Sequence, residues 1–284
     1  MTFSERITRR RQLWWDRPRW LALGPRGAVH RYREHWTFRS RDDADEAWRC
    51  CRLWQRTLLN KWNSREFAAR HGCRTPTLYW RGADPARAPL ASLPEQFVVR
   101  PVWGAARSGV LVVTDGRDLL RNGPVSRSTI RARLVRPRRF GRRPPLLIEE
   151  FVRSEDGQYR LPTEYKCHTF GATIAAVEVI DRTGVVEGAH RYYTAGWEPF
   201  ADPMHVGMPQ ADVKDPPRCL AEMLADATRL GVAFGTYVRV DFFAGDRGAV
   251  FNELSSTPFN GRDFTAYCDA FFGALWTEKF PDAS

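Results

Sequence analysis

The stretch TYVRVDFFAGDRGAVFNELSSTP, residues 236–258, decides the fold of this 284-residue chain. Two runs rich in valine and aromatic residues flank the turn AGDRG, a pattern typical of a β-hairpin. Side chains alternate faces along a strand, and Asp241 and Glu253 lie about equally far from the turn. We therefore predict that these acids are cross-strand neighbours, with Cβ atoms about 4.5–5.5 Å apart if directly opposed. By the same parity, Arg239 shares the face of Asp241, and Ser255 that of Glu253.

Two carboxylates at this separation repel each other, and the pKa of one rises unless a cation lies between them. Oxygen ligands without a thiol suit Mg²⁺, which usually takes one or two carboxylates and completes its shell with nucleotide phosphates. The hairpin therefore predicts a magnesium site at Asp241 and Glu253. The alternative is that one acid is exposed to solvent and the pair is structural.

A second predicted hairpin, at residues 97–113, carries a turn of small residues that suits a phosphate-rich ligand. Backbone N–H groups of such a turn can approach phosphate oxygens. Arg100 precedes the turn and Arg107 lies within it, and both can pair with phosphate. An ordinary β-turn without a ligand is the alternative.

Lys166 lies in the middle of a predicted strand, where an unpaired lysine is costly. A phosphate would satisfy it, and so would an ion pair with Glu164, two residues back on the same face. A further strand, residues 148–152, ends in paired acids. His168 and His190 are candidate bases, although an isolated histidine is more often structural.

The composition narrows the class of protein. The net charge is +11, yet 40 of the basic residues are arginine and only four are lysine, namely Lys61, Lys166, Lys214 and Lys279. This skew is typical of a GC-rich genome, so it weakens charge as a sign of function and draws attention to each lysine. Six cysteines without metal or disulfide spacing indicate a reduced, cytoplasmic protein. We expect no membrane span and no signal peptide.

The N-terminal third is rich in arginine and tryptophan, with eight of the 11 tryptophans before residue 81. Their spacing favours helices that pack tryptophan into a core, including one over residues 42–59. The alternative is a surface that stacks and grips nucleic acid. Residues 131–143 carry seven arginines and are interpreted as a loop, either solvated or clamping an anionic substrate.

Three more helices are predicted. The first begins at a capping-box pattern of Asn63 and Glu66 and stops at Gly72. The others cover residues 219–232 and 264–276, and a strand pair with a turn at Gly171 covers residues 164–182.

Taken in order, five motifs resemble the ATP-grasp superfamily and, within it, the TupA-like branch named for teichuronopeptide biosynthesis. They are NKWNSREFAARHGCRTP (60–76), LPEQFVVRPVWGAARSGVLVV (93–113), LLIEEFV (146–152), EYKCHTFGATIAAVEVIDR (164–182) and YVRVDFF with FNELSSTP (237–243 and 251–258). The resemblance implies an α+β ATP-grasp fold, in which two α/β subdomains with mainly antiparallel sheets grip a nucleotide. It implies a lid subdomain over 61–147 and a C-terminal subdomain over 148–284. Residues 1–60 have no counterpart in it and are expected to form an arginine- and tryptophan-rich helical extension.

The resemblance also implies ATP and Mg²⁺ as cofactors and assigns roles to individual residues. Catalysis would fall to Arg239 at the γ-phosphate, to Lys166 beside the nucleotide and to Arg182 at the acceptor. Asp241 and Glu253 would hold the metal, with Ser255 where many relatives have an asparagine ligand. The nucleotide would be held by Arg100, Gly104, Ala105, Ala106, Arg107, Ser108, Gly109, Glu149, Glu150, Phe151, Val152 and Lys166. Arg100 and the loop residues depart from the lysine and glycines of the family.

The function that this resemblance implies is an ATP-dependent carboxylate–amine ligase that acts through an acyl phosphate. Its partners would be ATP, an acidic carboxylate substrate and an amine, in polysaccharide or peptide natural-product biosynthesis. A kinase that phosphorylates a hydroxyl group is one alternative. A basic nucleic-acid-binding protein is another, although no nucleic-acid motif accompanies the tryptophans.

Overall fold

A computed structural model describes residues 37–50, 54–104, 109–135, 144–182, 188–258 and 263–281, with the side chain of Arg182 excepted. Every structural statement below concerns these residues. Several predicted site positions lie outside them, namely Ala105, Ala106, Arg107, Ser108 and the Arg182 side chain. Most of the arginine-rich stretch, residues 136–143, and the first 36 residues also lie outside.

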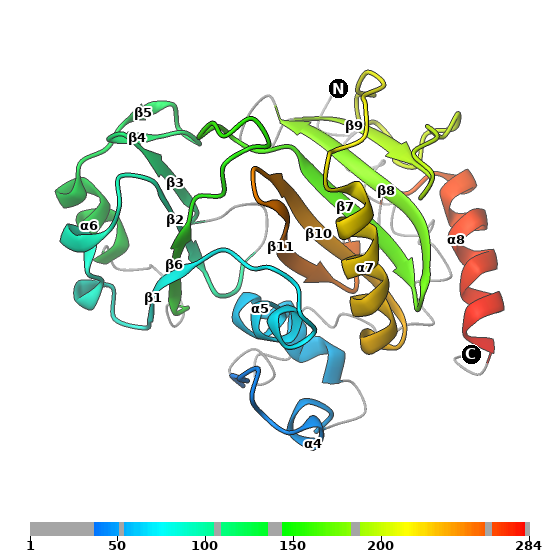
Figure 1. The fold of residues 1–284 in the computed structure, drawn as a ribbon, viewed down its shortest axis with the longest axis horizontal. Helices are drawn as coiled ribbons and strands as arrows, with labels where there is room; N and C mark the ends of the chain where they lie inside the picture. Colours follow the sequence, from blue (N-terminus) through cyan, green and yellow to red (C-terminus); the bar gives the residue numbers. More distant parts are fainter. Residues whose placement is uncertain are drawn as a thin grey trace, which may run out of the picture.

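Two antiparallel sheets stand side by side (Figure 1). The first sheet has the order β1-β6-β2-β3-β4-β5, and the second has the order β11-β10-β7-β8-β9. The strands of the first sheet are β1 (Leu78–Gly82), β2 (Phe97–Pro101), β3 (Leu111–Thr114), β4 (Arg117–Asp118), β5 (Gly123–Pro124) and β6 (Leu146–Glu150). Those of the second are β7 (Glu164–Phe170), β8 (Thr173–Arg182), β9 (Gly188–Tyr193), β10 (Tyr237–Gly245) and β11 (Gly248–Ser255). The predicted boundary between the lid and C-terminal subdomains, at residue 147, falls inside β6, so the first sheet extends past this boundary.

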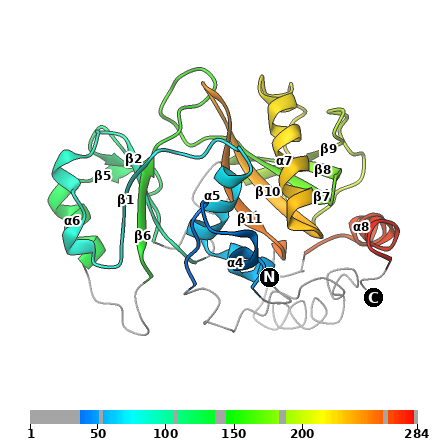
Figure 2. The ribbon, with the colours of Figure 1, turned by 60° about the horizontal axis from the view of Figure 1, so that its bottom comes forward.

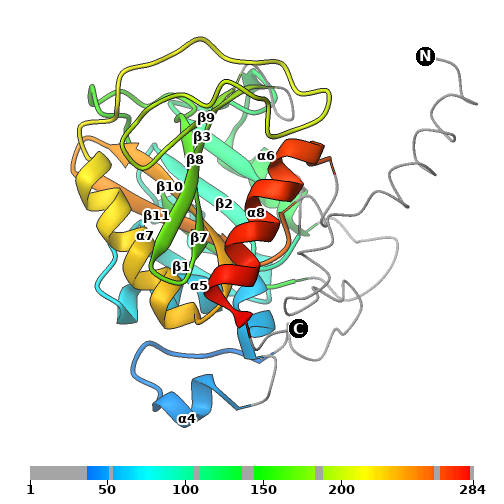
Figure 3. The same cartoon turned by 90° about the vertical axis from the view of Figure 1, so that its right-hand side faces the viewer.

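Two helices lie on opposite sides of the second sheet (Figure 3). Helix α7 (Leu220–Phe234) has an apolar stripe at helical spacing, and this stripe packs on what we call the back face of the sheet. It ends where Gly235 adopts a left-handed conformation with φ 78°. Helix α8 (Ala266–Lys279) covers part of the opposite, front face through its aromatic side chains. Both helices were predicted, to within three residues at each end.

The first sheet is covered by α6 (Arg127–Val135), whose Ile130 and Leu134 join its apolar core. Two short 3-10 turns, Pro85–Arg87 and Leu90–Ser92, pack beside it. Arg131 donates to the backbone carbonyls of this region, so the start of the predicted arginine loop is a helix with a structural arginine.

Helix α5 (Lys61–Arg70) lies between the first sheet and the hairpin β10–β11 (Figure 2). Its N-cap is Asn60, whose side chain accepts hydrogen bonds from the N–H groups of Trp62 and Asn63. The predicted capping box at Asn63 is therefore wrong. A second asparagine one turn earlier provides the cap, and Asn63 is buried instead, donating to the Thr57 carbonyl at 2.9 Å. The predicted stop at Gly72 is confirmed by its φ of 76°.

The predicted helix over residues 42–59 is also wrong. The described part of this stretch holds only the short helix α4 (Asp45–Trp48) and a 3-10 helix, Trp54–Leu59. Trp48 and Trp54 are both buried against Phe67, so the core interpretation holds for these two side chains. The spacing of the apolar residues is compatible with two short helical segments as well as with one long helix.

Strand β9 is an element that the sequence did not predict. Its residues pair with β8 at the edge of the second sheet, where neighbouring strands decide the conformation of a short, half-polar segment. Among the described residues, no helix has the length and apolar character needed to cross a membrane.

Candidate active site

The hairpin β10–β11 has the predicted register. Asp241 lies opposite Glu253 and Arg239 lies opposite Ser255, all four from the same face of the sheet. A β-bulge separates this pair from the next, because Phe242 pairs with Phe251 and Asn252 becomes the extra residue. The sequence count did not foresee the bulge.

Asp241 is buried among cations. The guanidinium of Arg239 donates to both of its carboxylate oxygens, at 2.7 and 2.8 Å, and the Lys166 Nζ lies 3.7 Å away. Burial raises the pKa of Asp241, while the charges of Arg239 and Lys166 act in the opposite direction. Burial alone would lower the pKa of Arg239, but its ion pair with Asp241 outweighs burial and raises it. The Asp241 carboxylate therefore lies next to two positively charged side chains.

Glu253 faces a lysine that the sequence analysis gave no role. The Lys61 Nζ, at the first residue of α5, lies 3.2 Å from Glu253 and donates to the Gly104 carbonyl at 3.0 Å. Burial raises the pKa of Glu253, but Lys61 and the neighbouring arginines outweigh it and lower the pKa to about 2. The scarcity of lysine in this chain was the one signal that pointed to Lys61.

A polar row crosses the front face of the second sheet. In register, Glu253 pairs with Asp241, Asp241 with Lys166, Lys166 with Glu178 and Glu178 with Tyr192. The Lys166 Nζ also lies 3.5 Å from Glu164, so the predicted ion pair is present, and the contact of Lys166 with phosphate stays a prediction. A cation therefore stands between acids on three neighbouring strands.

The first sheet contributes Arg100, which reaches across to the hairpin. Its Nε donates to Glu149 at 2.6 Å, and its Nη1 donates to the side chain of Asn252 at 2.8 Å. The bulge therefore places Asn252 against the other sheet. Glu149 also accepts from Arg65 of α5 at 3.0 Å, a partner that the sequence analysis missed.

Within the part of the chain that the structure describes, the remaining predicted site residues make no hydrogen bond or ion pair with the charged side chains of this cluster. Glu150 bonds to Thr77 and Arg247, at the outer end of the sheet. Phe151 and Val152 follow it as buried apolar residues. Ser255 lies opposite Arg239, and the described residues give it no hydrogen bond through its side chain. The structure does not describe the side chain of Arg182. Gly109, the first described residue after 105–108, has φ 78°.

The donor set fits Mg²⁺ that is shared with a nucleotide. Two carboxylates lie side by side, and the described residues hold no group of three His, Cys, Asp or Glu side chains arranged for a metal. Mg²⁺ commonly uses one or two carboxylates and takes its other oxygens from phosphates and water. A metal that required a cage of protein ligands would not fit here.

Two antiparallel sheets that meet at a cluster of arginines, lysines and paired acids define the ATP-grasp class of fold. The chain belongs to the TupA-like ATP-grasp family, whose model matches residues 61–277. This confirms the resemblance that the five motifs suggested. No curated protein matches the chain.

Solved structures of ATP-grasp ligases are similar to the chain at low identity. The ATP-grasp ligase PsnB, complexed with a minimal precursor, is 14% identical, with a TM-score of 0.44 and coverage of 78% of this chain and 61% of that one. D-Alanine–D-alanine ligase from Helicobacter pylori is 17% identical, with a TM-score of 0.47 and coverage of 81% and 61%. N5-carboxyaminoimidazole synthetase from Staphylococcus aureus, complexed with ADP, is 11% identical, with a TM-score of 0.47 and coverage of 78% and 52%. The chain spans less than two thirds of each of them.

Proposed function

We propose that the protein is a Mg·ATP-dependent ligase that joins a carboxylate to an amine through an acyl phosphate. The observation that carries this proposal is the pairing of Asp241 with Glu253 inside a ring of cations. Those cations are Arg239, Lys166 and Lys61, and Arg100 reaches the same hairpin. Fixed positive charges at these positions suit a triphosphate and a phosphoryl group in transfer.

In the first step, an oxygen of the substrate carboxylate attacks the γ-phosphorus of ATP. The bond from the γ-phosphorus to the bridging oxygen breaks, and ADP leaves with the electron pair. Arg239 and Lys166 supply positive charge, in a buried site, to oxygens that become more negative. Asp241 and Glu253 would hold Mg²⁺, which when bound offsets phosphate charge and orients the triphosphate.

In the second step, the nitrogen of a neutral amine attacks the carbonyl carbon of the acyl phosphate. A C–N bond forms, the C–O bond to phosphate breaks, and inorganic phosphate leaves. The reaction needs no nucleophile from the protein. The net charge of +11 suits an acidic carboxylate as the first substrate, since positive charge raises the local concentration of anions.

The test is product analysis with ATP, Mg²⁺ and a panel of carboxylates, with hydroxylamine as the nucleophile. The expected products are ADP, free phosphate and a hydroxamate, in equal amounts. If the phosphate stays on an organic product, the protein is a kinase and the proposal is wrong. Retention by a nucleic-acid column with no Mg·ATP binding would also overturn it.

A further inference from the structure

The polar row of the second sheet continues away from the metal acids to a buried carboxylate. Glu178 lies in the middle of β8 and is completely buried, opposite Lys166 on one side and Tyr192 on the other. Burial raises the pKa of Glu178, but His168, whose Nε2 lies 3.6 Å away, and the hydrogen bond with His190 outweigh burial and hold the pKa well below its usual range. Glu178 is therefore an ionised carboxylate within the protein.

His190 of β9 makes the shortest contact with this carboxylate, at 2.6 Å from its Nδ1 to Glu178 Oε1. An ionised carboxylate only accepts hydrogen bonds, so the Nδ1 atom must carry the proton. In the neutral imidazole with its proton on Nδ1, the Nε2 atom is the proton acceptor. Among the described residues no hydrogen bond occupies this Nε2 atom, and His190 is 8% exposed.

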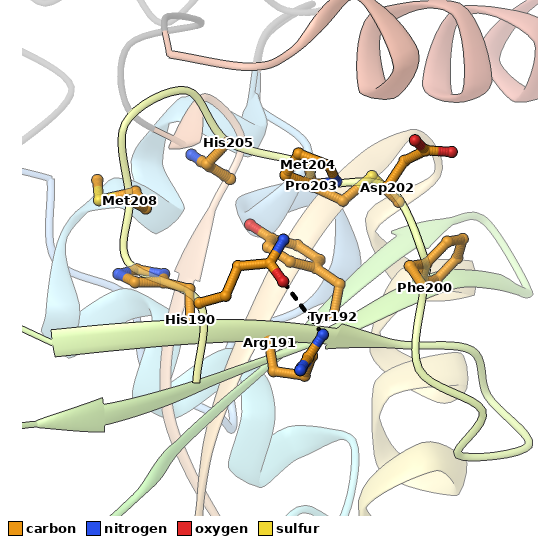
Figure 4. Close-up of a pocket in the computed structure, with 10 residues that line it drawn as sticks. His190, Arg191, Tyr192, Phe200, Asp202, Pro203, Met204, His205 and Met208 are labelled. Atoms are coloured by element: carbon orange, nitrogen blue, oxygen red, sulfur yellow. Dashed lines mark hydrogen bonds between the residues drawn. The ribbon is translucent and has the colours of Figure 1, made fainter. Parts of the chain in front are cut away.

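The two histidines that the sequence suggested as bases differ in access. His168 is fully buried, bonds to the Tyr237 hydroxyl at 2.9 Å and packs on Phe272 of α8. His190 instead lines a hollow beneath the segment of residues 200–210, which arches over β9 (Figure 4). Only His190 of this pair can meet a ligand.

The hollow is open to solvent, and the space within it, counted with the solvent-filled part, is about 300 Å³. Tyr192, Phe200, Met204 and Met208 give it apolar surface beside the rings of His190 and His205, and three polar residues, Arg191, Asp202 and Gln210, also line it. Strands β9 and β10 are separated by β8 and β7, so His190 lies three strand spacings, roughly 14 Å, from the strand that carries Asp241. A phosphoryl group, an acyl group and an amine in series have about this length.

We propose that His190, oriented by Glu178, is the general base that deprotonates the amine substrate, and that the hollow beside it binds an apolar group carried by that amine. This inference rests on the proposed ligase function. The ammonium form of the amine gives one proton to His190 Nε2 and keeps the electron pair on nitrogen. That pair forms the C–N bond, and phosphate leaves with the electrons of the C–O bond. The second proton of the nitrogen passes to the departing phosphate.

The groups that face His190 favour this role. Glu178 faces it from β8, His205 faces it from the overlying segment at 6.2 Å between ring centroids, and His168 and Lys166 lie beyond Glu178 on β7. Burial lowers the pKa of His205 to about 4 and also lowers the pKa of His168. Both neighbouring rings are therefore neutral near pH 7, and the carboxylate of Glu178 is available to stabilise an imidazolium at His190.

The test separates the two half-reactions. The variant His190→Asn keeps a donor for Glu178 and removes the proton acceptor. Hydroxylamine is neutral near pH 7 and needs no base, whereas an amino acid presents an ammonium group. We expect the variant to form hydroxamate at a rate within about threefold of the wild type, and to lose about 10²- to 10⁴-fold in amide formation with amino acids. The rate that remains in the variant should follow the fraction of the amino acid that is already a neutral amine, and should therefore rise with pH.

Each other outcome has a definite meaning. Equal loss in both reactions, or unchanged amide formation, overturns the role of His190. Absence of hydroxamate from the wild type overturns the ligase proposal itself. His71→Gln, at the end of α5, is the matched histidine control and should change neither rate.

Two further measurements do not depend on loss of activity. Nitrogen-15 NMR of the wild type should show the His190 ring with its proton on Nδ1, and a ring protonated on Nε2 alone would overturn the proposal. In competition, leucine should exceed aspartate as the amine by at least about tenfold in kcat/KM, and a preference for aspartate would overturn the apolar assignment of the hollow.

Discussion

The two sheets hold their buried charges in different ways. In the first sheet, Glu149 is closed between Arg65 and Arg100 at 3.0 and 2.6 Å, and Arg100 continues to Asn252 at 2.8 Å. On the second sheet, apart from the Arg239–Asp241 pair, the cations stand 3.2 to 3.7 Å from the acids. The first network satisfies its charges within the protein, whereas the second leaves charges placed for a ligand to complete.

The largest expected effect comes from breaking the second network at Asp241. Asp241→Asn removes a metal ligand and should lower ATP turnover by at least about 10³-fold, about 4 kcal/mol in activation free energy. It also leaves Arg239 buried without its counter-charge, which should cost about 3–5 kcal/mol in the free energy of unfolding. ADP release and urea unfolding measure the two effects.

The matched variant is Glu253→Gln, which removes the other proposed metal ligand. Its partner Lys61 is 16% exposed, so water can still solvate the lysine when the carboxylate is gone. We expect a similar loss of turnover with a smaller loss of stability. Turnover within tenfold of the wild type in both variants would show that these acids do not hold the metal.

Breaking the first network should affect stability. Glu149→Gln leaves two buried arginines short of negative charge and should lower the free energy of unfolding by about 3 kcal/mol. Glu150→Gln is the control, since its partner Arg247 is half exposed and such a pair contributes about 0–1 kcal/mol. Equal losses in the two variants would mean that the closed network has no special role.

The back face of the second sheet depends on close packing and can be tested at Gly231 of α7. A Cβ atom there would lie 2.3 Å from the Gly171 carbonyl oxygen and 2.7 Å from Thr169 Oγ1. Gly231→Ala should therefore destabilise the protein by about 1–3 kcal/mol, although alanine is normally the better helix former. Val232→Ala, at an exposed position of the same helix, should stay within about 0.5 kcal/mol. Thermal unfolding distinguishes them, and a stabilised Gly231→Ala would contradict the packing.

The smallest expected effect is a shift in the pH of acid unfolding, caused by a substitution at Lys61. Glu253 has a pKa of about 2 in the folded protein, below the ordinary value of about 4.3, so its ionisation adds stability that is complete above the ordinary value and is lost as the pH falls toward 2. Lys61→Met should raise this pKa and move the acid-unfolding midpoint upward by about half a pH unit. Circular dichroism from pH 5 to pH 2 measures the shift. Lys279→Met, beside Glu278, is the control, and an equal shift there would contradict the role of Lys61.

Much of the second sheet was predictable because its strands are adjacent in the sequence. The turns at Gly171 and Gly245–Gly248 bring each strand back beside its neighbour, and a period of two predicts which side chains share a face up to the register shift in each pair. The bulge at Asn252 and the strand β9 were not predictable. A bulge requires only one extra residue, and an edge strand takes its conformation from its neighbour.

The hairpin motif alone placed Asp241 and Glu253 close together on paired strands. The bulge at Asn252 made them direct partners, because a count from Gly245–Gly248 without it sets Asp241 opposite Asn252. Only the tertiary structure decided which cations surround that pair, and which histidine meets Glu178. Lys61 lies 192 residues before Glu253, and Arg100 lies 152 residues before Asn252. Contacts over such separations follow from the packing of α5 and the two sheets, because no local spacing rule links their residues.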